Sequence, residues 1–178
     1  PESGEILVKR RNAVNFENMS IAVANLLANA AGSTSTYEIS TMRFGNGGTS
    51  IDGLGAVTYK ATNTNSASGA LYNQTHSQTV DDDITSSVDN QVTANHTSPN
   101  SYSDVVTTCT LDYNIPAGQD LTDTGTDMNG TYVFDELALY TANNDLLTHV
   151  VFHPVQKSAN RKIQVVYTLR IRSSFADL

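Results

Sequence analysis

The sequence predicts a mainly β protein, an antiparallel β-sandwich or jelly roll with one N-terminal amphipathic helix. Thr, Asn and Ser are abundant, and only 16% of the 178 residues are charged. This composition favours strands and polar loops over helical bundles, whose exposed faces are rich in Glu and Lys. Short apolar or alternating segments, separated by turns rich in Gly, Asn and Asp, indicate the same architecture. The length suits one domain with extended ends.

The chain is expected to divide into three parts. Residues 1–15 form an extended, basic N-terminal arm, residues 16–172 form one β-sandwich domain, and residues 173–178 form a C-terminal tail. Apolar side chains spaced three and four apart predict a helix over residues 16–31 at the start of the domain: Phe16, Met19, Val23, Leu26 and Ala30. Such a helix either covers its own sandwich or reaches a neighbouring copy, and the sequence leaves both open.

The first strands are predicted around glycine-rich turns. A strand over 37–44 runs into residues 45–48, Gly-Asn-Gly-Gly, which turn because such residues adopt positive φ. A short strand over 56–59 follows a second set of glycines, and the unpatterned segment 61–70 is a surface loop. Leu71 and Tyr72 anchor a strand over 71–80, which ends at a run of three aspartates, since adjacent like charges stay in water.

Later strands are predicted by alternation. In the segment 102–113, one face presents Val105, Thr107, Cys109, Leu111 and Tyr113; in 161–172, one face presents Ile163, Val165, Tyr167, Leu169 and Ile171. Weaker alternation predicts a strand over 88–96, and a Gly/Asp/Thr loop occupies 114–130. The strands 131–141 and 146–152 form a hairpin across the turn 143–145.

The charge distribution argues against nucleic acid as a partner and is compatible with assembly of several copies. The formal net charge is −8, and residues 61–156 contain twelve acids but no Lys or Arg. An acidic middle of this kind repels nucleic acid, so no nucleic-acid partner is expected. No apolar run approaches the ~20 residues of a membrane-spanning helix, and no signal-peptide pattern is present, so no membrane partner is expected either. Basic terminal segments could instead meet the acidic face of a neighbouring copy, giving head-to-tail assembly.

No catalytic, cofactor-binding or metal-binding residues are assigned, and the chain is not expected to be an enzyme. His149 and His153 lie four apart on a predicted strand, about 13 Å from each other at ~3.3 Å per residue, too far to share one ion. Acidic residues 81–83 and 123–129 lack the complete ligand spacing of a Ca²⁺ loop. The single cysteine, Cys109, is expected to be a small buried apolar residue.

Two groups of segments carry a resemblance to a known family. The first contains Met42-Arg43-Phe44-Gly45-Asn46-Gly47-Gly48-Thr49, followed by Asp52-Gly53-Leu54-Gly55 and Leu71-Tyr72-Asn73-Gln74; the second contains Phe134-Asp135-Glu136-Leu137-Ala138-Leu139-Tyr140 and Leu147-Thr148-His149-Val150-Val151-Phe152-His153. Together they resemble a family of uncharacterised virion structural proteins of tailed bacteriophages. The Phe-x-Glu-x-x-Leu-Tyr pattern is also similar to strands of tail-fibre and baseplate-attachment domains.

The resemblance implies a non-enzymatic structural component of the virion. We expect it to be assembled in the host cytoplasm as a homo-oligomer, and the strand similar to tail-fibre attachment domains favours the neck, collar or tail. Its partners would be further copies of itself and other virion proteins. Two alternatives remain open: a capsid decoration protein, or a β-sandwich module that binds a glycan or receptor through loops 61–70 and 114–130. Few aromatic rings are available for sugars, with Tyr59, Tyr72 and Tyr102 the candidates near those loops. Position on the particle, stoichiometry and strand order are left undetermined.

Overall fold

A computed structural model gives the arrangement of the strands, and it describes residues 13–15, 23, 26, 36–64, 69–80, 89–98, 100, 102–121 and 130–172. This part of the chain contains ten strands: β1 (Ala13–Val14), β2 (Ile39–Gly45), β3 (Thr49–Ile51), β4 (Val57–Tyr59), β5 (Gln74–Thr79), β6 (Asn90–His96), β7 (Tyr102–Leu111), β8 (Val133–Thr141), β9 (Leu146–Gln156) and β10 (Ile163–Arg172). The mainly β, antiparallel character predicted from composition and alternation is confirmed.

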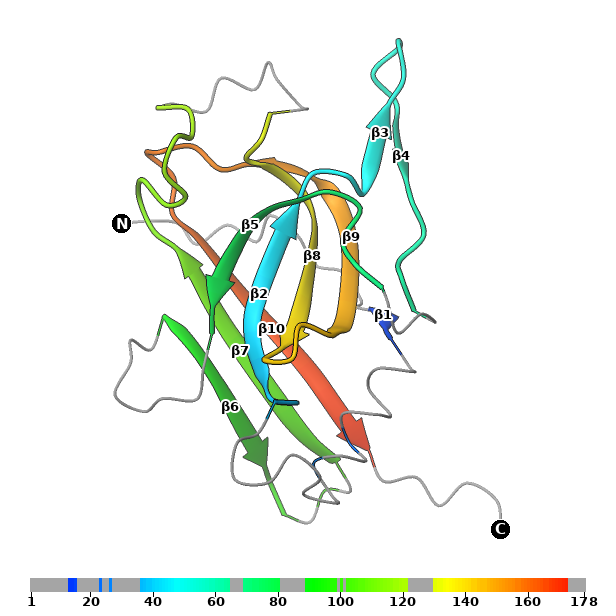
Figure 1. Cartoon of the computed structure of the whole chain (residues 1–178), viewed down its shortest axis with the longest axis vertical. Coiled ribbons are helices and arrows are strands. Elements are labelled where there is room, and N and C mark those ends of the chain that lie inside the picture. The colour runs from blue at the N-terminus through cyan, green and yellow to red at the C-terminus, as the bar shows by residue number, and fades with distance from the viewer. Residues whose placement is uncertain are drawn as a thin grey trace.

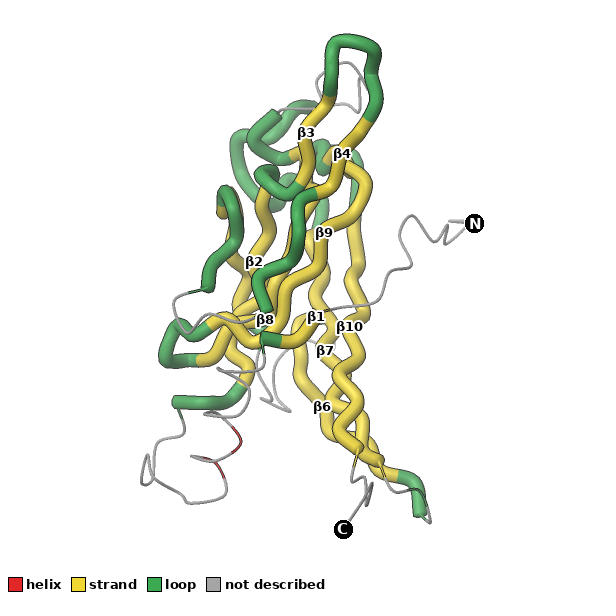
Figure 2. Tube along the Cα trace, turned by 90° about the vertical axis from the view of Figure 1, so that its right-hand side faces the viewer, coloured by secondary structure: helices red, strands yellow, loops and turns green. Residues whose placement is uncertain are grey.

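The strands form two main sheets and one separate hairpin (Figure 1). One sheet has the order β1-β9-β8-β2-β5, the other has the order β10-β7-β6, and β3 pairs with β4 alone. Every neighbouring pair is antiparallel. In both views the β3–β4 hairpin projects from one end, whereas β6, β7 and β10 extend to the other end (Figure 2).

One apolar core joins the two sheets. Both contribute to a single cluster of buried side chains: Met42, Phe44, Val80, Cys109, Leu111, Phe134, Leu137, Leu139, Val150, Phe152 and Tyr167. A second, smaller cluster consists of Leu71, Ala138, Tyr140 and Leu146. Because β8 supplies residues to both clusters, every residue of β8 is buried, and this strand does not show the half-exposed alternation of an outer strand.

Several predicted elements agree with the structure. The turn at 143–145 joins β8 to β9, with Asn144 at φ 71°, and β7 buries Thr107, Cys109 and Leu111 on the predicted face. Two end residues differ from the prediction. Tyr113 lies beyond β7 and is 47% exposed, and Ile171 is 50% exposed near the end of β10, because the core does not extend that far.

Some predictions fall outside the described residues. The arm 1–15 is described only at residues 13–15, where Ala13 and Val14 pair with β9 as β1. The helix over 16–31 is described only at Val23 and Leu26, so it stays a prediction. The aspartates 81–83, the acidic segment 123–129 and the tail 173–178 also lie outside the described part.

Candidate functional site

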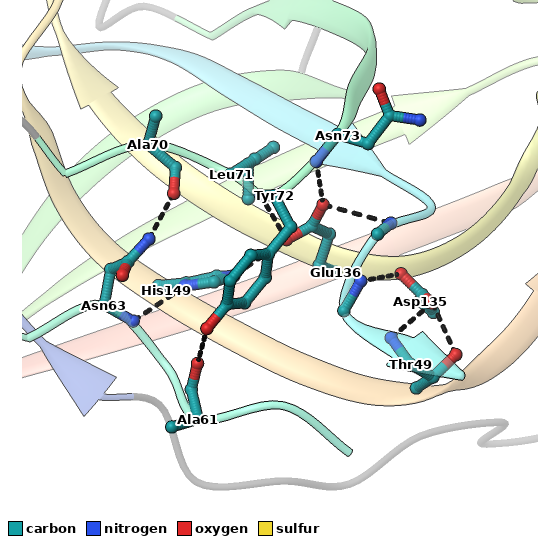
Figure 3. A network of polar contacts seen from close by, with 12 residues as sticks. Thr49, Ala61, Asn63, Ala70, Leu71, Tyr72, Asn73, Asp135, Glu136 and His149 are labelled. Carbon is teal, nitrogen blue, oxygen red and sulfur yellow. Dashed lines mark hydrogen bonds and ion pairs between the residues drawn. The ribbon is translucent and has the colours of Figure 1, made fainter. Parts of the chain in front are cut away.

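A buried carboxylate on β8 organises a network of polar contacts that joins several loops (Figure 3). Glu136 is 0% exposed, and its two oxygens accept four hydrogen bonds. Oε1 accepts from the backbone N–H groups of Gly47 at 3.2 Å and Asn73 at 2.8 Å. Oε2 accepts from the backbone N–H of Tyr72 at 3.0 Å and from His149 Nε2 at 3.0 Å. The carboxylate therefore ties two loops to the middle of a buried strand.

The protonation of His149 follows from its partners. This histidine on β9 is 0% exposed, and its Nδ1 accepts a hydrogen bond from the backbone N–H of Asn63 at 2.9 Å. A ring nitrogen that accepts from an N–H has no proton of its own, so Nε2 holds the proton and donates it to Glu136. His149 is thus a neutral imidazole that links the segment around Asn63 to the carboxylate.

The neighbouring carboxylate, Asp135, holds the start of the projecting hairpin. Its Oδ1 accepts from the Gly48 N–H at 2.9 Å, and its Oδ2 accepts from the N–H of Thr49 at 2.8 Å and from the hydroxyl of the same threonine. The backbone N–H of Lys60 donates to the Gly48 carbonyl at 2.8 Å. Both ends of the β3–β4 hairpin are therefore fixed at one point beside β8.

The glycines of the turn are required by close approach rather than by positive φ. A Cβ on Gly45 would lie 2.5 Å from both Asn73 O and Glu136 Oε1. On Gly47 it would lie 2.8 Å from Asn73 N and from Tyr72 Cβ. Neither residue is among the glycines with positive φ, which are Gly55 and Gly118 in the described chain. The predicted turn is confirmed, but the reason given for its glycines is wrong: they let two loops and a carboxylate meet.

The electrostatic balance at Glu136 favours the charged form. Burial alone raises the pKa of a carboxyl group, but the hydrogen bonds from His149 and from the Asn73 and Tyr72 amides outweigh burial and lower the pKa of Glu136. Further hydrogen bonds reach the pair from the Gly47 amide, which donates to Glu136 Oε1, and from the Asn63 amide, which donates to His149 Nδ1. A Glu–His pair that is 0% exposed and bonded to backbone on both sides has the properties of a structural clamp.

The two histidines singled out in the sequence have different environments. His149 is buried in the clamp, whereas His153 on the same strand is exposed, with its Nδ1 3.4 Å from the Tyr59 hydroxyl. Residues four apart on a regular strand would share a face. The pairing of β8 with β9 is irregular between Phe134 and Glu136, opposite the stretch of β9 that contains His153. The spacing of the two histidines gave no signal for the hydrogen bonds that His149 makes with Glu136 and Asn63.

The described residues can be examined for metal ligands and for the environment of the single cysteine. Within that part of the chain, no group of three or more His, Cys, Asp or Glu side chains could hold a metal ion. Cys109 is 0% exposed, and burial raises the pKa of its thiol to about 12, so it is the inert apolar residue that the alternation predicted.

A polar hollow of about 350 Å³ lies at the described ends of the loop 114–130, one of the two loops expected to bind a glycan or receptor. It is lined by Gly118, Gln119, Asp120, Gly130, Thr131, Tyr132, Val133, Gln156 and Lys157. Lys157 is only 1% exposed, and its Nζ donates to Gln119 Oε1 and to the Ser158 carbonyl, both at 3.0 Å. Burial lowers the pKa of this ammonium group. The hollow therefore offers hydrogen-bonding groups and little apolar wall.

The candidate sugar-stacking rings lie on different parts of the fold. Tyr59 and Tyr72 are 44% and 42% exposed, and Lys60 Nζ lies 4.6 Å from the centre of the Tyr72 ring. Tyr102 lies at the start of β7, with the Arg170 guanidinium 3.9 Å from its ring centre. Lys60 lies beside the Tyr72 ring and His153 lies beside Tyr59, so each of these two exposed rings has a polar neighbour.

Comparison with known proteins adds no relative: no family model, no curated protein and no solved structure matches the chain. Among the described residues, no helix is long and apolar enough to cross a membrane.

Proposed function

We propose that the chain is a non-enzymatic structural component of a tailed-bacteriophage virion, which assembles as a homo-oligomer at the neck, collar or tail. Its fold would be a β-sandwich whose five-stranded and three-stranded sheets enclose the core. The observation that supports this role is the clamp at Asp135 and Glu136. The two carboxylates accept hydrogen bonds from the three backbone N–H groups of the Gly47–Thr49 turn and from the backbone N–H groups of Tyr72 and Asn73.

The clamp also connects the two sequence motifs behind the resemblance. The glycine turn at 45–48 belongs to one motif, and Asp135 and Glu136 belong to the other. In the fold they form one unit, and their function in that unit is to hold loops on a rigid sheet. A particle component needs this kind of stiff scaffold with projecting segments, whereas an enzyme needs polar groups left available for substrate.

The test is the composition of the particle encoded by the genome that contains this gene. Virions purified by density gradient should contain the chain at a fixed copy number relative to the major capsid protein, measured by quantitative mass spectrometry. Immunogold labelling of the same particles should then separate the neck or tail from the capsid surface, where a decoration protein would lie. Absence of the chain from purified virions would contradict the proposal.

A glycan-binding module is the second candidate, and the surface around Tyr59 and Tyr72 favours it. Exposed rings beside Lys60 and His153 combine an apolar face with hydrogen-bonding groups, as sugar sites require. Glycan-array binding that is lost in Tyr59→Ala but retained in Tyr113→Ala, an equally exposed tyrosine elsewhere, would support this function. An array without signal would exclude it for the glycans displayed.

A further inference from the structure

A buried lysine meets a side-chain amide where the loop after β7 contacts the end of β9. Lys157 is buried, and its Nζ donates to Gln119 Oε1 and to the Ser158 carbonyl, both at 3.0 Å. An ammonium group has three N–H donors, so one donor of Lys157 has no acceptor among the described residues. No described carboxylate forms an ion pair with this lysine either. A charge buried in this way is costly to the fold.

The amide of Gln119 is also incompletely bonded. Its Nε2 is buried and has no hydrogen-bond partner in the described part of the chain. Turning the amide over would not provide one, because Nε2 would then face the N–H donors of Lys157. A buried donor without an acceptor lowers the stability of the fold. Two polar groups that touch each other therefore both lack partners, and a purely structural role leaves this arrangement unexplained.

Hydrogen bonds on either side hold the lysine and the glutamine against each other. The Ala159 amide donates to the Asp120 carbonyl at 2.7 Å, and Gln156 Nε2 donates to the Asp120 carboxylate at 3.3 Å. The backbone amide of Lys157 donates to the Tyr132 carbonyl at 2.8 Å. Since Nζ lies 3.0 Å from Oε1 and a C=O bond is about 1.23 Å long, Nζ lies within about 4.2 Å of the amide carbon, Cδ.

We propose that Lys157 and Gln119 react with each other to form an intramolecular isopeptide bond and release ammonia. The neutral Nζ attacks Cδ, the Cδ–Nε2 bond breaks, and Nε2 leaves with a proton taken from the lysine nitrogen. The product is a neutral secondary amide in which Oε1 remains the carbonyl oxygen. The proton that the ammonium group gives up at the start is taken up by the released ammonia, so the step balances without a further reactant.

The environment of the two groups favours this reaction. Burial lowers the pKa of Lys157 and so favours the neutral amine, which is the nucleophile, although the charge of Asp112 acts in the opposite direction. Contact between the groups makes the step unimolecular, and effective molarities in such cases reach about 10⁵–10⁸ M. A slow rate is sufficient, because the bond forms once in each chain. The hollow that both residues line gives the ammonia a way out.

The bond joins the two main sheets of the fold. Gln119 follows β7 of the three-stranded sheet, and Lys157 follows β9 of the five-stranded sheet. The bond also removes both unsatisfied groups, because the lysine loses its charge and the glutamine loses Nε2. This inference goes beyond the proposed role in the virion and does not depend on it.

The test is the intact mass of the full wild-type chain, measured by mass spectrometry under denaturing conditions after a week in neutral buffer. The chain should be lighter than its sequence by one molecule of ammonia. Because residues 61–156 contain no Lys or Arg, trypsin releases Gln119 in one long peptide that begins after Lys60. An isopeptide bond blocks cleavage after Lys157, so this peptide should end at Arg161. Chymotrypsin should then convert it to a branched peptide that contains both linked residues.

Variants separate this bond from other losses of ammonia. Lys157→Arg keeps the positive charge but removes the amine, and Gln119→Met keeps the length of the side chain but removes the amide. Both variants should have the full mass of their own sequences. Gln156→Met changes the neighbouring glutamine instead and should still lose ammonia. Succinimide formation at an asparagine also releases ammonia, but that loss would persist in Lys157→Arg.

Three results would overturn the inference. These are a wild-type chain with its full mass, a tryptic peptide that ends at Lys157, and a loss of ammonia that persists in Lys157→Arg. The first two are measured on the wild type, so they decide the question even where a variant fails to fold. All three leave the structural role standing, because presence in the virion is measured independently on purified particles.

Discussion

Replacing Glu136 with glutamine tests whether the clamp stabilises the fold. In the wild type, both carboxylate oxygens accept two N–H donors each. A glutamine oxygen can keep the bonds from Gly47 and Asn73, but the glutamine NH₂ then faces the Tyr72 N–H and His149 Nε2–H. His149 cannot relieve the conflict by moving its proton to Nδ1, since that nitrogen accepts from the Asn63 N–H.

The expected loss of stability in Glu136→Gln follows from two N–H donors, on Tyr72 and His149, that are left without an acceptor. Each unsatisfied buried group costs about 1–3 kcal/mol, so Glu136→Gln should lower the free energy of unfolding by about 2–5 kcal/mol after local relaxation. Urea denaturation followed by circular dichroism measures this loss. The matched control is Glu38→Gln, the same substitution at an exposed side chain, with an expected change within about 0.5 kcal/mol. Equal effects of the two variants would refute the clamp.

The dependence of stability on pH tests independently whether Glu136 is charged in the folded protein. Because the folded-state pKa of Glu136 is lowered, its contribution to stability is present above the unfolded value of about 4.3 and is lost as the pH falls through the lower folded value. The stability difference between wild type and Glu136→Gln should therefore be full at neutral pH and shrink below about pH 4. A difference that grows on acidification would contradict the charged form of Glu136.

Three further changes probe the packing around the clamp and the core. Gly47→Ala should destabilise the fold by about 1–3 kcal/mol in urea, because the new Cβ meets backbone at 2.8 Å, whereas Gly53→Ala, with nothing within 4 Å, should not; equal values would contradict the close approach. Leu169→Ala, at a side chain only 8% exposed, should cost about 2–4 kcal/mol, against under about 0.5 kcal/mol for exposed Val166→Ala, and the reverse order would show a wrong β10 register. Cys109 should resist a thiol reagent at pH 8 until the protein is denatured, and rapid native labelling would refute its burial.

The strands that the sequence predicted best are those whose own pattern determines their burial. β7 and β10 alternate because one face meets the core and the other faces outward, and a period of two is visible in a single sequence. The hairpin of β8 and β9 was predicted from its turn residues at 143–145. β3 was missed because its three residues are a strand through pairing with β4, and so short a segment has no periodicity of its own.

The clamp could not be derived from spacing, because its parts are far apart in the chain. Glu136 meets Tyr72 and Asn73, 64 and 63 residues away, and Gly47, 89 residues away. One local signal was available: Asp135 and Glu136 are adjacent acids inside the otherwise apolar run Val133–Tyr140. Buried carboxylates require hydrogen-bond donors, and a glycine-rich turn is a segment whose backbone N–H groups can approach closely. The sequence indicated both features but not their contact.

The projecting β3–β4 hairpin is attached to the clamp by hydrogen bonds at its base. Asp135 holds the first residue of β3, and the Lys60 amide fixes the chain just after β4 to the Gly48 carbonyl. At the tip, the Asp52 side chain accepts from the Leu54 and Ala56 amides, so the turn that presents Leu54 at 96% exposure is itself ordered. Leu54 therefore lies on a hairpin whose start is hydrogen-bonded to a buried carboxylate of the five-stranded sheet. An exposed leucine on a fixed hairpin loses little conformational entropy when another protein covers it, which is the property expected of a contact between particle components.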